Sequence, residues 1–137
     1  MGLYDWLLFL HVLSAFVVVG ALVVLWGLVL GTRAEPAFDG AAAGSIGKGA
    51  GIAVGAGLVG TLVFGIWLAV EVEGYGLLDG WILASLILWA FSGFAGDRAG
   101  RAAGRGPEGR RTWIRLQAVN SFVVILILAL MIWKPGA

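Results

Sequence analysis

The fold follows from an uncharged stretch near the start of the chain, residues 6–32, which reads WLLFLHVLSAFVVVGALVVLWGLVLGT. Three further uncharged stretches follow it, at Gly49–Val70, Gly80–Gly96 and Leu116–Trp133. A helix needs about 20 apolar residues to cross a hydrocarbon core about 30 Å thick, and these stretches fall in that range or at its short edge. The sequence therefore predicts an all-α fold, a four-helix transmembrane bundle.

The composition agrees with a membrane-embedded chain. Of the 137 residues, 61% are hydrophobic and 12% are charged, whereas a soluble domain keeps about a quarter of its residues charged. We predict one integral membrane domain over residues 1–137, with spans at approximately 4–31, 49–71, 80–97 and 113–133. The chain start lacks the basic residues of a signal peptide, so the first stretch is predicted to be a retained span.

The basic residues are concentrated in alternate gaps between the stretches. Arg33 and Lys48 lie in the first gap, six arginines lie in the third gap between Arg98 and Arg115, and Lys134 is the only cation elsewhere. Cytoplasmic loops are enriched in Lys and Arg, so both gaps are predicted to face the cytoplasm of a bacterial inner membrane, with both termini outside. The predicted outer boundary then carries an aromatic belt: Tyr4, Trp6, Tyr75, Trp81 and Trp133.

Local signals indicate where the helices begin and end. Asp79 is predicted to cap the third span, and Thr112 is predicted to cap the fourth, which Pro135 ends. Gly106 and Pro107 should interrupt any helix between these two spans.

Small residues recur at four-residue spacing in the second stretch. Such rows let helix backbones approach closely in lipid. They predict close packing within the chain or, as an alternative, a seam between two copies in a homo-oligomer. The rows are Gly47, Gly51 and Gly55; Ala53 and Gly57; and Ala56 and Gly60.

His11, the only histidine, lies about 7–8 Å inside the predicted outer boundary. An ionisable residue within a span indicates a functional site, because burying it is costly unless it is satisfied. Three interpretations remain open: a hydrogen bond between helices, metal ligation or proton handling, and a role at the lipid interface. Its predicted neighbours at the same depth are Trp67, Glu71, Ser85 and Met131, the last as a second axial ligand of a haem.

Two further polar groups are predicted inside the bundle. In the third stretch, a stripe at helical spacing is expected to face the bundle: Trp81, Ser85, Trp89, Ser92 and Gly96. In the fourth, Gln117, Asn120 and Ser121 share a face with Trp113, and Asn120 is predicted to lie about 15 Å from His11 along the membrane normal. The fourth-stretch group is expected to form hydrogen bonds between helices or, alternatively, a polar entrance for a small solute.

The arginine-rich segment Arg98–Arg115 lacks the interleaved aromatic residues of a nucleic-acid-binding surface, so no nucleic acid is predicted as a partner. Its expected partners are the lipid bilayer and anionic lipid headgroups, because cations next to a membrane attract them.

The opening Tyr4-Asp-Trp-Leu-Leu-Phe-Leu-His11-Val-Leu-Ser-Ala resembles a bacterial family of four-span integral membrane proteins, a domain of unknown function. The stretches Gly65-Ile-Trp-Leu-Ala-Val-Glu71 and Gly80-Trp-Ile-Leu-Ala-Ser85 look like the second and third spans of that family. The Leu-His-Val-Leu element is also similar to copper-resistance D-like membrane proteins and to membrane haem proteins of the protoporphyrinogen oxidase type. In those families the first-span histidine is associated with copper or haem, so the resemblance implies His11 as a ligand.

These observations lead to one function hypothesis and two alternatives. The first is a bacterial inner-membrane protein, not an enzyme, with a structural, accessory or small-solute transport role, because the sequence shows no phosphate loop, paired embedded carboxylates, nucleophile elbow or multi-histidine motif. The second is a haem- or copper-binding protein that uses His11. The third is a small proton-coupled exporter, which would need an embedded carboxylate that the first stretch does not have.

Overall fold

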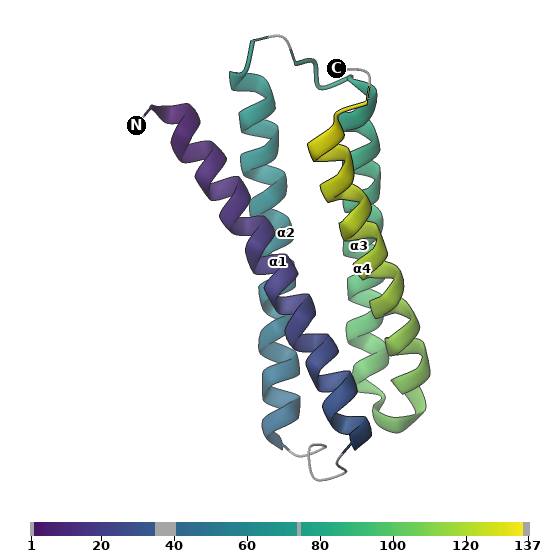
Figure 1. Cartoon of the computed structure of the whole chain (residues 1–137). Coiled ribbons are helices and arrows are strands. Elements are labelled where there is room, and N and C mark those ends of the chain that lie inside the picture. The colour runs from purple at the N-terminus through teal and green to yellow at the C-terminus, as the bar shows by residue number, and fades with distance from the viewer. Residues whose placement is uncertain (1, 35–40, 74, 136–137) are drawn as a thin grey trace.

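The computed structural model describes residues 2–34, 41–73 and 75–135 of the chain, and the described part contains four long helices (Figure 1). Each of the four is long and apolar enough to cross a membrane. The predicted all-α four-helix bundle is therefore confirmed, and the architecture is that of a multi-pass membrane protein. The helical elements are α1 (Leu3–Ala34), α2 (Ala41–Glu71), α3 (Gly80–Gly104), the 3₁₀ turn η2 (Gly106–Gly109) and α4 (Arg110–Trp133).

The four helices form two hairpins. Helix α1 packs along α2 and α3 packs along α4, whereas contacts between the two hairpins are much sparser. In Figure 1 the hairpins lie close together at one end and diverge toward the end that carries the N and C labels.

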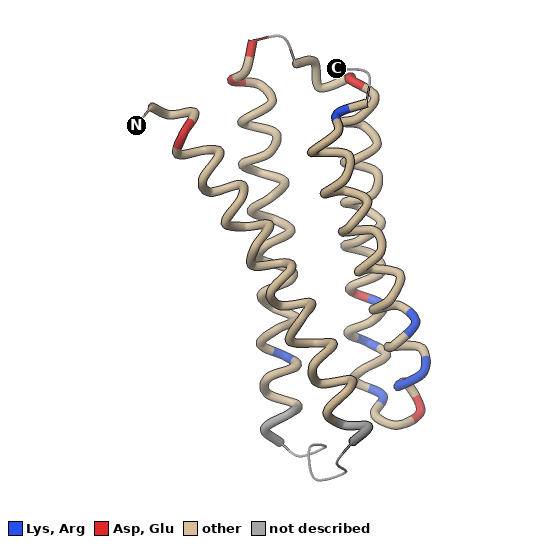
Figure 2. Tube along the Cα trace, in the orientation of Figure 1, with Lys and Arg blue, Asp and Glu red and all other residues tan. Residues whose placement is uncertain are grey.

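The charged residues distinguish the two ends of the bundle (Figure 2). We call the end where the hairpins diverge the acidic end, because Asp5, Glu71, Glu73 and Asp79 lie there. We call the opposite end, which contains Arg98–Arg115, the basic end. The basic residues of the third gap thus lie together at one end, as the predicted orientation requires. That this end faces the cytoplasm stays a prediction.

The buried core lies where the hairpins meet. Its apolar cluster joins Val18 and Leu22 of α1 to Val54 and Leu58 of α2 and to Val124 of α4. Two tryptophan side chains add hydrogen bonds between the hairpins. Trp26 Nε1 donates to Ser121 Oγ at 2.9 Å, and Trp89 Nε1 donates to the Leu58 carbonyl at 2.8 Å.

Glycines hold α1 and α2 close together, but at fewer positions than predicted. A Cβ added at Gly57 would lie 2.6 Å from Val18 Cγ2 and 2.9 Å from the Ser14 carbonyl oxygen, and one added at Gly60 would overlap the Ser14 side chain. By contrast, a Cβ at Gly51 or Gly55 would meet nothing within 4 Å. Gly51 and Gly55 therefore do not pack within the described chain, although a Cβ at Gly47 in the same row would contact Leu28 Cδ1 at 3.4 Å. A seam with a second copy at Gly51 and Gly55 stays a prediction.

Both predicted side-chain caps are wrong. Asp79 precedes α3, but its Oδ2 accepts the Gly76 amide at 3.0 Å and closes the preceding turn, so the side chain does not cap the helix. Thr112 lies inside α4, because η2 continues almost directly into that helix from Gly109. The predicted interruption is confirmed, since α3 ends at Gly104 and Gly106 has a φ of +65°.

The helices extend beyond the predicted spans, mainly toward the basic end. Helix α2 begins at Ala41 rather than near residue 49, α3 continues to Gly104 rather than ending near 97, and α4 begins at Arg110 rather than near 113. Alanine and arginine favour helix even where the chain leaves the membrane, so hydropathy underestimates these lengths. The middle of the predicted first loop, residues 35–40, and Gly74 lie outside the described residues.

Candidate functional site

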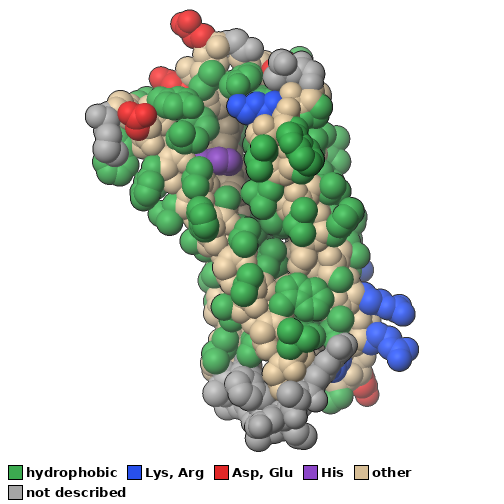
Figure 3. All heavy atoms as spheres, in the orientation of Figure 1, with side chains coloured by type: hydrophobic (Ala, Val, Ile, Leu, Met, Phe, Trp, Pro, Cys, Tyr) green, Lys and Arg blue, Asp and Glu red, His purple; other side chains and the backbone are tan. Residues whose placement is uncertain are grey.

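A cleft with a volume of about 690 Å³ lies between the two hairpins near the acidic end. All four helices contribute to its walls, which are mainly aliphatic and aromatic. Figure 3 shows the histidine side chain, in purple, within a hollow on this face of the molecule. The polar or ionisable side chains that line the cleft are Tyr4, His11, Thr61, Tyr75, Trp81, Ser85, Trp89 and Lys134.

The packing of the hairpins explains where the cleft ends. Val18, Leu58 and Val124 line the cleft and also belong to the buried core. The hydrogen bond from Trp89 to the Leu58 carbonyl joins the hairpins at the same level. These contacts form the floor of the cleft, because they bring the hairpins together on the side of the cleft that faces the basic end.

His11 lies on the α1 side of the cleft and is hydrogen-bonded to α2. Its Nδ1 lies 3.0 Å from the carbonyl oxygen of Thr61, which is purely an acceptor, so Nδ1 carries the proton in this bond. In the neutral imidazole Nε2 then has a lone pair, and no described residue hydrogen-bonds to it. The ring also packs on Gly65, where an added Cβ would lie 2.9 Å from His11 Cε1.

This geometry agrees with one interpretation of His11, a hydrogen bond between helices, and leaves metal ligation open. The hydrogen bond to Thr61 joins two helices, as the structural interpretation predicts. The same bond orients the ring in the way that metal-binding histidines are often oriented, through one nitrogen bonded to a carbonyl.

Lys134 forms the acidic-end rim of the cleft together with two aromatic rings. Its Nζ donates to the Tyr75 hydroxyl at 3.0 Å and lies 4.9 Å from the Tyr75 ring centroid and 5.7 Å from that of Trp81. Both distances are in the range of cation–π attraction. Trp81 is only 6% exposed, so it is part of this packed rim, in agreement with the predicted stripe of the third stretch that faces the bundle.

The structure places some of the predicted neighbours of His11 in the cleft and others outside it. Ser85 and Met131 line the cleft, but Ser85 Oγ donates to the Trp81 carbonyl of its own helix at 2.8 Å. Trp67 is 48% exposed, and Trp67 and Glu71 do not line the cleft. The prediction is therefore wrong for Trp67 and Glu71, because depth along a helix does not determine the direction of a side chain around the helix axis.

Sequence reasoning missed Lys134 and Tyr75 as site residues. Lys134 is the single cation at the acidic end among the described residues, and this isolation was visible in the sequence. Its partner was not visible, because Tyr75 belongs to the turn between α2 and α3 and reaches Lys134 only in the folded bundle.

The second polar group lies away from the cleft and joins helices. Ser92 Oγ donates to Asn120 Oδ1 at 2.5 Å between α3 and α4, and both side chains are almost fully buried. Ser121 receives the bond from Trp26. Gln117 is also buried, and its Nε2 has no partner within the described residues. Hydrogen bonding between helices is thus the observed role of this group.

The described residues contain no group of three or more His, Cys, Asp or Glu side chains placed to hold a metal ion. A metal or haem in the cleft would therefore depend on a smaller donor set, such as His11 with Met131.

Comparison with known proteins gives no match for this chain: no protein-family model, no curated protein and no solved structure is significantly similar to it. The resemblances carried by the stretch around His11 stay predictions.

Proposed function

We propose that this protein is a non-enzymatic membrane protein that binds a hydrophobic or amphiphilic small molecule in the cleft, in an accessory or small-solute transport role. The membrane is the bacterial inner membrane, and the acidic end faces outward. The cleft is the observation that supports this function. Small-molecule sites are concave and mostly apolar, with a few placed polar groups and volumes of about 300–1,000 Å³.

The polar groups in the cleft fit a ligand that is apolar over most of its length. His11 Nε2 offers one hydrogen-bond acceptor on the α1 side, and Lys134 carries one positive charge at the rim. The remaining lining is dominated by residues such as Leu8, Leu62 and Ile127. A ligand with an apolar body and a small polar group satisfies both parts of this surface.

Filling the cleft should weaken ligand binding. Ala15 lines the cleft from α1, so Ala15→Phe puts a phenyl ring where a ligand would lie. Overpacking costs about 1–3 kcal/mol. We therefore expect the dissociation constant of the neutral fluorescent probe N-phenyl-1-naphthylamine, measured in nanodiscs against empty nanodiscs, to rise by about tenfold or more.

The matched control for this experiment is Val23→Phe, which adds the same ring to a position on α1 that is 65% exposed and does not line the cleft. It should leave probe binding unchanged. Equal binding by both variants, or no saturable binding by the unmodified protein, would count against the proposed function.

Haem or copper binding is a second candidate function, because His11 and Met131 line the same cleft. The imidazole nitrogen Nε2 and the methionine sulfur are a known axial pair for haem and a suitable donor pair for Cu(I). The bond from Nδ1 to Thr61 leaves Nε2 available for such a role. These residues therefore fit either group at the level of donor chemistry.

The test is the absorption spectrum and metal content of protein expressed with haem precursor and copper supplied. If His11 is a ligand, a Soret band or stoichiometric copper will be present, His11→Ala will abolish it, and Met131→Leu will shift or weaken it. Protein that contains neither group, or a signal unchanged in His11→Ala, would exclude His11 as the ligand.

A further inference from the structure

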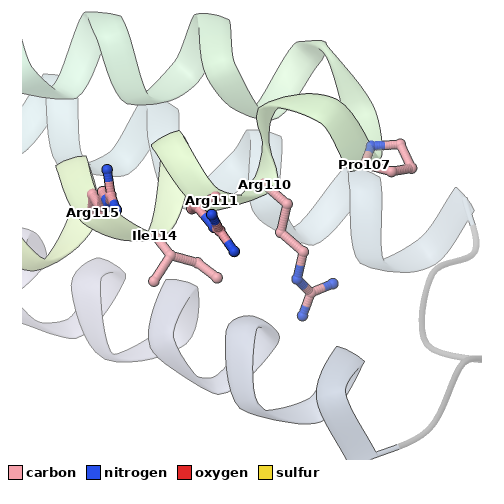
Figure 4. Close-up of a pocket in the computed structure, with 5 residues that line it drawn as sticks. All are labelled: Pro107, Arg110, Arg111, Ile114 and Arg115. Atoms are coloured by element: carbon pink, nitrogen blue, oxygen red, sulfur yellow. The ribbon is translucent and has the colours of Figure 1, made fainter.

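A second concave surface lies at the basic end and is lined by arginines. Its lining comes from η2 and the first turns of α4: Pro107, Arg110, Arg111, Ile114 and Arg115. Figure 4 shows Arg110 and Arg111 extending from the start of α4 on the side of α1, with Ile114 farther along the same helix. We call this surface the arginine pocket.

The arginines of α3 and those of α4 differ in their partners. On α3, Arg101 forms an ion pair with Asp97 at 2.7 Å, and Arg98 lies over the Phe94 ring at 4.8 Å from its centroid. On α4, Arg111 and Arg115 are exposed and form no ion pair with a described residue. No acidic side chain lines the arginine pocket in the described part of the chain.

Arg110 links the pocket to the first hairpin. Its Nη2 lies 3.5 Å from the Val29 carbonyl oxygen of α1, so the guanidinium is directed across the gap between the two helices. The pocket thus has a positively charged wall on α4 and lies beside α1.

The position of the pocket matches a membrane boundary. The uncharged stretch of α4 begins at Leu116, immediately after Arg115. At about 100° per residue, Phe122 and Ile125 lie within about 40° of Arg111 on the helix surface. Both are more than 60% exposed, so an apolar track continues from the charged wall along the same face of α4.

We propose that the arginine pocket binds the phosphate of an anionic phospholipid, whose acyl chains lie along Phe122 and Ile125. Arginine suits this ligand because its guanidinium can donate two parallel hydrogen bonds to phosphate oxygens. Ile114 and the apolar track beyond it suit acyl chains. A soluble phosphate ion has no such chains. The charge of the pocket and the apolar face together favour a phospholipid over a soluble phosphate or an uncharged apolar molecule.

The proposal is tested by native mass spectrometry of the full chain in detergent, titrated with phosphatidylglycerol. Arg111→Gln/Arg115→Gln removes two charges from the pocket. Arg98→Gln/Arg101→Gln removes two charges from the neighbouring helix and serves as the matched control. A cation near a membrane surface contributes about 1 kcal/mol to anionic lipid binding. We expect the first dissociation constant to rise about tenfold or more in the pocket variant and less than about threefold in the control.

Several outcomes would overturn this proposal. Equal weakening in the two variants would show diffuse attraction by net charge, and equal binding of zwitterionic phosphatidylcholine would show that the anion is not recognised. Displacement of the lipid by an equal concentration of inorganic phosphate would show a phosphate site that does not use acyl chains. Helical circular dichroism of both variants confirms that they are folded.

Discussion

Replacing Gly57 with alanine is expected to destabilise the protein by about 1–3 kcal/mol, the usual cost of an added group in a tightly packed interface. The new Cβ would lie 2.6 Å from Val18 Cγ2 and 2.9 Å from the Ser14 carbonyl oxygen. The Val18 methyl can rotate away, but a backbone carbonyl in the middle of α1 cannot. Helix α1 must therefore move away from α2, with loss of contacts along the first hairpin.

The same substitution at Gly51 provides the matched control. It lies in the same helix, but an added Cβ would meet nothing within 4 Å. Alanine favours helix over glycine by about 1 kcal/mol in water, so Gly51→Ala should be neutral or slightly stabilising. Denaturation by SDS, followed by circular dichroism in one detergent, gives both unfolding free energies. Equal changes in the two variants would contradict the close approach at Gly57.

The orientation of the bundle is expected to give an all-or-none result with reporter fusions. Fusions that end at Tyr75 should show alkaline phosphatase activity, which requires export, and fusions that end at Gly106 should show fluorescence from a cytoplasmic green fluorescent protein. The physical reason is the retention of basic gaps on the cytoplasmic side: Arg33 and Lys48 orient the fusion at Tyr75, and Arg98, Arg101 and Arg105 add to them in the fusion at Gly106.

Exchanging the reporters at the two positions is the control, because each should then be silent. A phosphatase signal at Gly106 or cytoplasmic fluorescence at Tyr75 would invert the orientation. It would also put the cleft on the cytoplasmic side and the arginine pocket on the outside.

The sequence predicts the helices well because a helix that crosses a membrane needs about 20 mainly apolar residues, and such stretches are easily recognised. It also predicts that Ser92 and Asn120 are buried polar residues, since such side chains inside a span need partners on neighbouring helices. The helix ends are predicted less well. Beyond the membrane, residues such as Ala41 and Arg110 can be either helix or loop, and the choice depends on neighbouring contacts.

The direction of each side chain around its helix is what the sequence could not supply. Gly51 and Gly57 have similar sequence surroundings, yet only Gly57 faces α1. The partner of His11 is the backbone carbonyl of Thr61, and any residue type carries such a carbonyl. For this reason depth alone predicted Met131 correctly as a cleft residue and Trp67 incorrectly.

The distribution of hydrogen bonds between the hairpins has a consequence for membrane insertion. His11 bonds to α2 within the first hairpin, and Ser92 bonds to Asn120 within the second. Each hairpin can therefore enter the lipid as a unit with these groups already satisfied, which avoids the cost of exposing them to hydrocarbon. The bonds from Trp26 and Trp89 form when the two units associate, so the cleft is a product of assembly within the bilayer and not of either hairpin alone.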